Sequence, residues 1–158
     1  MSNFNGLEII RTAILMEEEG IRFYTECAKH AEGKAKDFLL IAAGQEFVHK
    51  DKFQKIYDDL SGSKEADYSY LFDEETTLYL KALIENKVFD KSEQPRDGFN
   101  NIKSALEYAV KSEELTVEVY TKMYSGITNV EVKAVLKELI EEEKTHAEYF
   151  RMLAKELA

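Results

Sequence analysis

Two short segments of the chain each combine a glutamate with a histidine three residues later. The segment "EFVH" holds Glu46 and His49, and "EKTH" holds Glu143 and His146. Residues three apart share a face of an α-helix, so each pair would present a carboxylate beside an imidazole. Carboxylate oxygens and imidazole nitrogens are ligands for Fe, Mn and Zn. One such pair in a glutamate-rich chain is weak evidence, because so short a motif also arises by chance.

Both pairs belong to an internal repeat. The segment "EEEGIRFY" at 17–24 aligns with "EELTVEVY" at 113–120, and "EFVH" then aligns with "EKTH" at nearly the same spacing. Each copy therefore has a glutamate two helical turns before a tyrosine: Glu17 and Tyr24 in one copy, Glu113 and Tyr120 in the other. The repeat predicts two halves related by a pseudo-two-fold axis, with matching helix faces at the centre.

Four glutamates fall on the apolar sides of the predicted helices: Glu17, Glu46, Glu113 and Glu143. Buried carboxylates close to one another cannot all stay ionised without compensating charge. Two divalent cations would balance them, and His49 and His146 would complete the ligand set. Helical bundles that hold two iron or manganese ions use one Glu from each of two helices and a Glu-x-x-His pair from each of the other two. The alternative, two solvated surface pairs and unrelated glutamates, is disfavoured by the repeat.

One position on the last helix has a competing choice. Glu142 lies four residues before His146 and Glu143 lies three before it, and both spacings share a helix face. The repeat favours Glu143, because Glu143 is the residue that aligns with Glu46.

Apolar residues recur at helical spacing along most of the chain, and helices are predicted over 5–31, 35–60, 100–124 and 130–157. Short loops make the first two helices antiparallel, and likewise the last two. The crossover at 61–99 contains one shorter helix, near 74–86, and is long enough to let the middle two long helices run parallel. We therefore predict an all-α four-helix bundle, built as one domain from residues 1–158.

Composition limits the possible partners. The net charge of −10 argues against binding to nucleic acid or to an anionic membrane, since both need basic surfaces. Cys27 is the only cysteine, so an intrachain disulfide is impossible and we expect it to be a small core residue. The N-terminal residues lack a basic start followed by an apolar stretch, which predicts a cytoplasmic protein without a signal peptide.

Through these motifs the whole chain resembles the rubrerythrin-type branch of the ferritin-like di-iron carboxylate proteins, and the crossover segment "YLKALIENKVF" is part of the resemblance. The resemblance implies a ferritin-like bundle with two iron ions, although the ligand types also permit Mn or Zn. It implies that Glu46 and Glu143 donate to the two metals, that Glu17 and Glu113 are further ligands, and that His49 and His146 each bind one metal. It also places the hydroxyls of Tyr24 and Tyr120 on ligating carboxylates. The alternative is that Tyr24 and Tyr120 are core aromatic residues with no role at the metals.

The chain departs from full-length rubrerythrins at two points. It lacks the paired Cys-x-x-Cys motifs of a rubredoxin domain, so an electron donor would be another, rubredoxin-like protein. Thr116 stands where the resemblance places an additional glutamate linked to peroxide chemistry, which leaves a ligand set closer to that of bacterioferritin.

Three functions remain open at this point. We expect a non-haem di-iron oxidoreductase that reduces peroxide or dioxygen, as in defence against oxidative stress. The alternatives are a ferroxidase that handles iron and a bundle with a structural, non-redox metal. We also expect a homodimer, because two-fold symmetric assemblies are the commonest.

Overall fold

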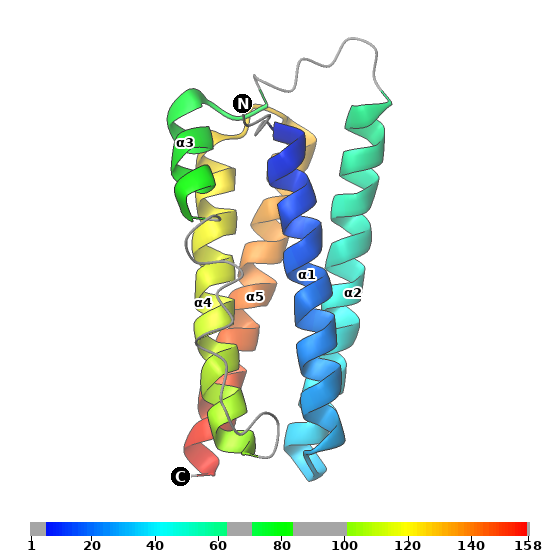
Figure 1. The fold of residues 1–158 in the computed structure, drawn as a ribbon, viewed down its shortest axis with the longest axis vertical. Coiled ribbons are helices and arrows are strands. Elements are labelled where there is room, and N and C mark those ends of the chain that lie inside the picture. Colours follow the sequence, from blue (N-terminus) through cyan, green and yellow to red (C-terminus); the bar gives the residue numbers. More distant parts are fainter. Residues whose placement is uncertain (1–5, 63–70, 84–100, 158) are drawn as a thin grey trace.

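The computed structural model describes residues 6–62, 71–83 and 101–157. Its helices are α1 (Gly6–Lys29), α2 (Gly33–Ser61), α3 (Glu74–Leu83), α4 (Ile102–Gly126) and α5 (Val130–Glu156). Helices α1 and α2 form one antiparallel hairpin and α4 and α5 form another, while the short α3 packs beside α4 (Figure 1). Helices α2 and α4 run in the same direction (Figure 1). The predicted all-α bundle of two hairpins joined by a crossover with a short helix is confirmed.

Helix ends differ from the predicted boundaries by a few residues. Helix α2 begins at Gly33 instead of residue 35, directly after the chain turns; Gly33 has a φ of +61°, a conformation that favours glycine. Helices α4 and α5 begin after Asn101 and Asn129, whose side chains each accept a backbone N–H at 3.1 Å, from Ser104 and Val132 respectively. The predicted end of the short helix, near residue 86, lies outside the described residues.

Backbone hydrogen bonds attach the segment directly before α3 to the turn between α4 and α5. The Asp73 N–H donates to the Gly126 carbonyl and the Thr128 N–H donates to the Leu71 carbonyl, each at 3.1 Å. A side chain at residue 126 would not fit, since a Cβ there would lie 2.1 Å from the Thr76 hydroxyl oxygen. The glycine therefore lets α3 reach the end of α4.

The interior contains two apolar clusters with a polar layer between them. One cluster joins the first half of α1 to the first half of α5, with residues such as Ile10 and Leu136. The other joins the second half of α1 to the second half of α5, with residues such as Tyr24 and Phe150. Each long helix crosses the polar layer near its middle. No helix in the described residues is long and apolar enough to cross a membrane.

Candidate metal centre

The polar layer brings together the six side chains that the sequence singled out as metal ligands. Each is at most 4% exposed, and they come from all four long helices: Glu17 of α1, Glu46 and His49 of α2, Glu113 of α4, and Glu143 and His146 of α5. The apolar stripe of each helix explains their burial, because each lies one or two turns from core residues of its own helix.

The six side chains form two overlapping groups. Glu17, Glu46, His49 and Glu143 offer donor atoms that lie within 4.8 Å of one another, and Glu46, Glu113, Glu143 and His146 do the same. Glu46 and Glu143 belong to both groups, whereas each histidine belongs to one. Two neighbouring ions could therefore share two carboxylates and each have a histidine of its own.

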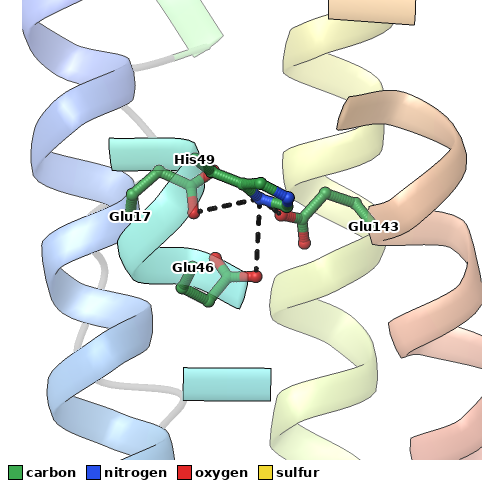
Figure 2. A group of neighbouring side chains, drawn as sticks. All are labelled: Glu17, Glu46, His49 and Glu143. Atoms are coloured by element: carbon green, nitrogen blue, oxygen red, sulfur yellow. Dashed lines mark hydrogen bonds and ion pairs between the residues drawn. The ribbon is translucent and has the colours of Figure 1, made fainter. Parts of the chain in front are cut away.

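The His49 imidazole faces three carboxylates through a single ring nitrogen. Its Nδ1 lies 2.8 Å from Glu143 Oε1, 3.6 Å from Glu17 Oε2 and 3.9 Å from Glu46 Oε1 (Figure 2). Such a cluster of donor atoms around one small volume is typical of a cation site.

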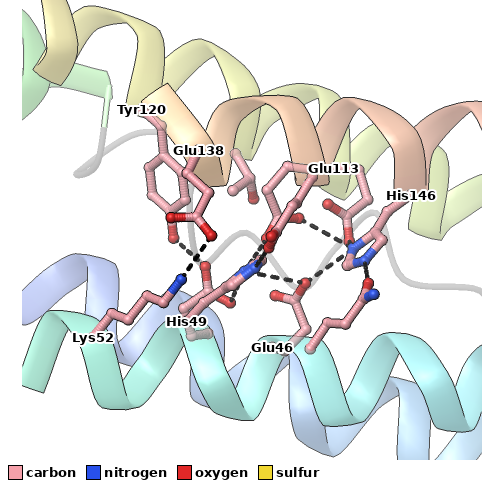
Figure 3. Close-up of polar contacts among 12 residues, drawn as sticks. Glu46, His49, Lys52, Glu113, Tyr120, Glu138 and His146 are labelled. Atoms are coloured by element: carbon pink, nitrogen blue, oxygen red, sulfur yellow. Dashed lines mark hydrogen bonds and ion pairs between the residues drawn. The ribbon is translucent and has the colours of Figure 1, made fainter. Parts of the chain in front are cut away.

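The imidazole of His146 repeats this arrangement in the second group. Its Nδ1 lies 3.1 Å from Glu46 Oε1, 3.5 Å from Glu143 Oε2 and 3.6 Å from Glu113 Oε1 (Figure 3). The two imidazole planes are nearly parallel, at 18°, with centroids 6.3 Å apart. The pseudo-two-fold relation predicted from the repeat is thus visible in the geometry of the two groups.

Unpaired polar atoms gather in this layer. Five buried side-chain atoms in the described residues lack a hydrogen-bond partner, and all belong to the six side chains: Glu17 Oε2, Glu46 Oε1, Glu113 Oε2, Glu143 Oε2 and His146 Nδ1. Leaving a buried polar group unpaired costs about 1–3 kcal/mol, more for a charged group. Metal ions bound among these atoms would supply the missing partners, so the donor set fits two cations.

Burial and mutual repulsion disturb the carboxylates. Burial, reinforced by the neighbouring charge of Glu143, raises the pKa of Glu17, Glu46 and Glu113. Burial also acts to raise the pKa of Glu143, but its close contacts with Glu113 and both histidines outweigh burial and hold that pKa below its usual range. Without a cation, three of the four carboxylates are therefore harder to ionise than an exposed glutamate.

The two imidazoles retain protons because of the carboxylates around them. Burial alone would lower their pKa values, but the carboxylates close to each Nδ1 outweigh burial. The neighbouring Glu143 and Glu17 raise the pKa of His49 to about 11. The neighbouring Glu113 and Glu143 raise the pKa of His146 to about 10. A metal ion must displace these protons, since it binds only neutral imidazole.

Two tyrosines hold the outer carboxylates in place. The Tyr120 hydroxyl of α4 donates to Glu17 Oε1 of α1 at 2.5 Å, and the Tyr24 hydroxyl of α1 donates to Glu113 of α4. Burial, together with the neighbouring carboxylates, raises the pKa of both phenols well above the usual value. They remain protonated donors, and each fixes the rotamer of the glutamate on the other hairpin.

Sequence reasoning did not identify the groups behind the histidines. His49 Nε2 hydrogen-bonds to Glu142 of α5, and His146 Nε2 hydrogen-bonds to Gln45 of α2. A hydrogen bond from Nε2–H to such a partner directs Nδ1 toward the metal and fixes the tautomer. Glu142, the competing ligand choice, thus lies outside both donor groups, while Glu143 belongs to both. The repeat contained the signal, because Gln45 and Glu142 each directly precede the inward glutamate.

Two further residues stand apart from the donor groups. The Thr116 hydroxyl donates to the Ser112 carbonyl of its own helix at 2.9 Å. Cys27 is buried in the apolar cluster of the second half of α1, and burial raises the pKa of its thiol to about 12.

Comparison with known proteins agrees with this geometry. The sequence model of the rubrerythrin family matches residues 8–154. A crystal structure from Thermotoga maritima, described as a ferritin-like diiron-carboxylate protein, superposes with a TM-score of 0.73 at 26% sequence identity. The match covers 98% of this chain and 97% of the other. A search of curated proteins found no significant match. The chain therefore belongs to the rubrerythrin family, with a ferritin-like fold and a buried two-metal site of carboxylates and histidines.

Proposed function

We propose that this protein is a non-haem di-iron oxidoreductase, which reduces peroxide or dioxygen with electrons from a separate donor. The observation that carries the proposal is the pair of donor groups sharing Glu46 and Glu143. Membership of the rubrerythrin family supports iron as the metal. Two ferrous ions held side by side would supply the two electrons that reduction of a peroxide bond requires.

Each residue of the layer would have a defined task in this function. Glu46 and Glu143 would hold both ions. Glu17 with His49 would complete one position, and Glu113 with His146 the other. The tyrosines would orient the outer carboxylates, and the surrounding apolar clusters would exclude bulk water and protect the reduced site from side reactions.

The electrons would come from another protein. Cys27 is the only cysteine and is buried, whereas a rubredoxin-type centre needs several cysteine thiolates. A rubredoxin-like donor would therefore dock on the outside of the bundle and deliver electrons to the buried layer.

A ferroxidase that oxidises and passes on iron is the second candidate, and Thr116 favours it. The Thr116 hydroxyl donates to a carbonyl of its own helix. Among the described residues, the two donor groups together contain no side chain beyond the six. The six-residue set would then resemble the simpler site of a ferritin-like iron-handling protein.

Stopped-flow mixing of the diferrous protein with peroxide, and separately with dioxygen, tests the proposal. We expect rapid oxidation by one of the two, retention of both irons, and repeated turnover when a reductant is supplied. Oxidation by dioxygen followed by release of ferric iron would favour the ferroxidase. Absence of oxidation by either oxidant would contradict both and leave a structural metal. Glu46→Ala is the inactive control, and Glu18→Ala, on the exposed side of α1, is the matched active control.

A further inference from the structure

Aromatic side chains are distributed unequally between the two halves of the metal centre. One ring pair is common to both halves: Phe150 lies beside Tyr24 with ring centroids 5.0 Å apart, and Phe53 lies beside Tyr120 at 5.3 Å. The repeat explains this match, because Phe53 and Phe150 occupy equivalent positions in it. The half that contains His146 has further rings without an aromatic counterpart.

These further rings include a stacked pair that joins α2 to α5. Phe38 of α2 stacks on Tyr149 of α5, with centroids 3.9 Å apart and an angle of 22° between the ring planes. At the equivalent positions of the other half the repeat has Val135 and Lys52. The stacked pair therefore belongs to only one of the two metal positions.

The stacked pair connects the surface to the side chain of a proposed metal ligand. Phe38 and Tyr149 are both half-buried, whereas His146 is 1% exposed. The Phe38 ring meets the His146 ring edge to face, with centroids 6.2 Å apart and planes at 87°. Phe150 adds a parallel contact, 5.0 Å from Phe38 and 6.4 Å from His146. A continuous series of rings thus leads from the surface to one imidazole of the donor groups.

We propose that electrons enter the metal centre through the stacked pair, from Tyr149 through Phe38 to His146. This inference rests on the proposed function, which requires a one-electron donor outside the bundle, such as an iron–sulfur protein. Electrons cross a protein by tunnelling, and the rate falls more steeply across gaps between atoms than through rings in contact. Each transfer oxidises the donor by one electron and reduces one ferric ion to ferrous, without making or breaking a bond. Two transfers restore the diferrous pair.

A second aromatic series on the same half provides an internal comparison. Phe23 lies between Tyr24 and the half-buried Tyr108, with centroids 5.9 Å and 5.0 Å away. This series reaches the donor groups only through the Tyr24 hydroxyl, which donates to Glu113. The stacked pair reaches the ring of a histidine directly, so it is the more direct route.

Flash reduction from a fixed point on the surface tests the route. Met152→Cys, one helical turn after Tyr149, places a thiol for a ruthenium–bipyridine photosensitiser beside the stacked pair. Met152 is 54% exposed, whereas the native Cys27 is buried and does not compete for the label. Lys55→Cys is the matched control, because Lys55 is exposed and holds the equivalent position of the repeat on the His49 side. Both labelled proteins are loaded with iron and oxidised with ferricyanide, so the measurement does not depend on peroxide or dioxygen.

A laser flash in the presence of a sacrificial donor produces ruthenium(I), which passes one electron to a ferric ion. Reduction should be several-fold faster from the label at residue 152 than from the label at residue 55. Phe38→Leu should slow reduction from residue 152 several-fold and leave reduction from residue 55 unchanged. Tyr108→Leu should change neither rate. Iron content per chain should match the wild type in each variant, because a purely structural loss would lower it or slow reduction from both labels.

Equal rates from the two labels, or no reduction from residue 152, would overturn the inference. A Phe38→Leu variant that is reduced as fast as the wild type from residue 152, or slowing by Tyr108→Leu alone, would also overturn it. These results leave the proposed function standing, since stopped-flow oxidation tests that function separately. Conversely, a diferrous protein that neither oxidant oxidises would contradict the function without changing the flash result.

Discussion

The two histidines of the metal centre are held from behind by chemically different groups. His49 Nε2 bonds to the Glu142 carboxylate, whereas His146 Nε2 bonds to the Gln45 side-chain oxygen. A carboxylate partner makes an imidazole more basic than an amide partner does, and such outer groups change metal affinity by about 10–100-fold. The two positions of an otherwise symmetric site are therefore inequivalent, with tighter binding expected beside His49.

Glu142→Gln tests this inequivalence at the level of one residue. We expect titration with Mn²⁺ or Zn²⁺ to show two unequal affinities in the wild type, with the tighter weakened about tenfold in the variant. The substitution keeps a hydrogen-bonding side chain but removes its charge. Glu141→Gln, on the exposed neighbour that pairs with Lys144, is the control. Identical binding curves for the wild type and Glu142→Gln would mean that the carboxylate does not tune His49.

The sequence predicted the six inward side chains better than it predicted the side chains that hydrogen-bond to Nε2 of the two histidines. Glu46 and Glu143 could be found because they lie on apolar stripes and recur in a repeat. Gln45 was missed, since it is an exposed polar residue whose role depends on α5 lying across from α2. Its one signal in the sequence was its place in the repeat, directly before Glu46, as Glu142 directly precedes Glu143. The metal-ligand roles of all six inward residues stay predictions.

At the scale of elements, α1 makes space for the central carboxylate of α2. Gly20 of α1 faces Glu46, and a Cβ on Gly20 would lie 3.1 Å from Glu46 Oε2. Such a contact is tighter than ordinary van der Waals packing, so the carboxylate would have to shift. Gly20 of α1 thus leaves room for Glu46 of α2, whose carboxylate belongs to both donor groups.

Gly20→Ala should make the metal-free protein more stable and at the same time weaken its binding of metal. Replacing a glycine within a helix should raise the free energy of unfolding of the metal-free protein by about 0.5–1 kcal/mol. The displaced Glu46 should weaken metal binding roughly tenfold, the lower end of the effect of disturbed outer groups. Urea unfolding and metal titration measure the two effects. Gly44→Ala, where a Cβ has open space, should leave metal binding unchanged. Wild-type metal affinity in Gly20→Ala would refute a role for the glycine in positioning Glu46.

The elements themselves were largely predictable, and their ends were not. The apolar period of 3.6 residues extends through each long helix, so the helices followed from it. Their pairing followed from the lengths of the connections between them. Their ends depend on single capping contacts such as that of Asn101. The residues that join α3 to the end of α4 were not predictable, because the need for Gly126 arises only when Thr76 comes against it.

At the scale of the whole molecule, pH should link metal binding to stability. In the metal-free protein the pKa values of Glu17, Glu46, Glu113 and both histidines are raised. A raised pKa means that the folded state holds protons the unfolded chain has lost. These groups therefore stabilise the metal-free fold below their unfolded pKa values. For the histidines that stability is lost as pH rises from about 6.5 through the folded values of about 10 and 11.

Metal binding replaces these protons, so it should become more favourable as pH rises. We expect the difference in melting temperature between the Zn²⁺-loaded and metal-free protein to widen between about pH 6 and about pH 8. Calorimetry at constant free metal measures it, and proton release on loading at neutral pH is an independent check. A difference that is constant or narrows over this range would mean that the ions do not displace protons from the buried layer.

The number of metal ions bound per chain after anaerobic loading with ferrous iron tests the central claim most directly. The two donor groups predict close to two ions in the wild type and in Glu18→Ala, whose side chain lies outside them. Glu46→Ala and Glu143→Ala should each lose the pair, because each removes a donor common to both groups. Near-zero loading of the wild type, or equal loading of all three variants, would contradict the two-metal site.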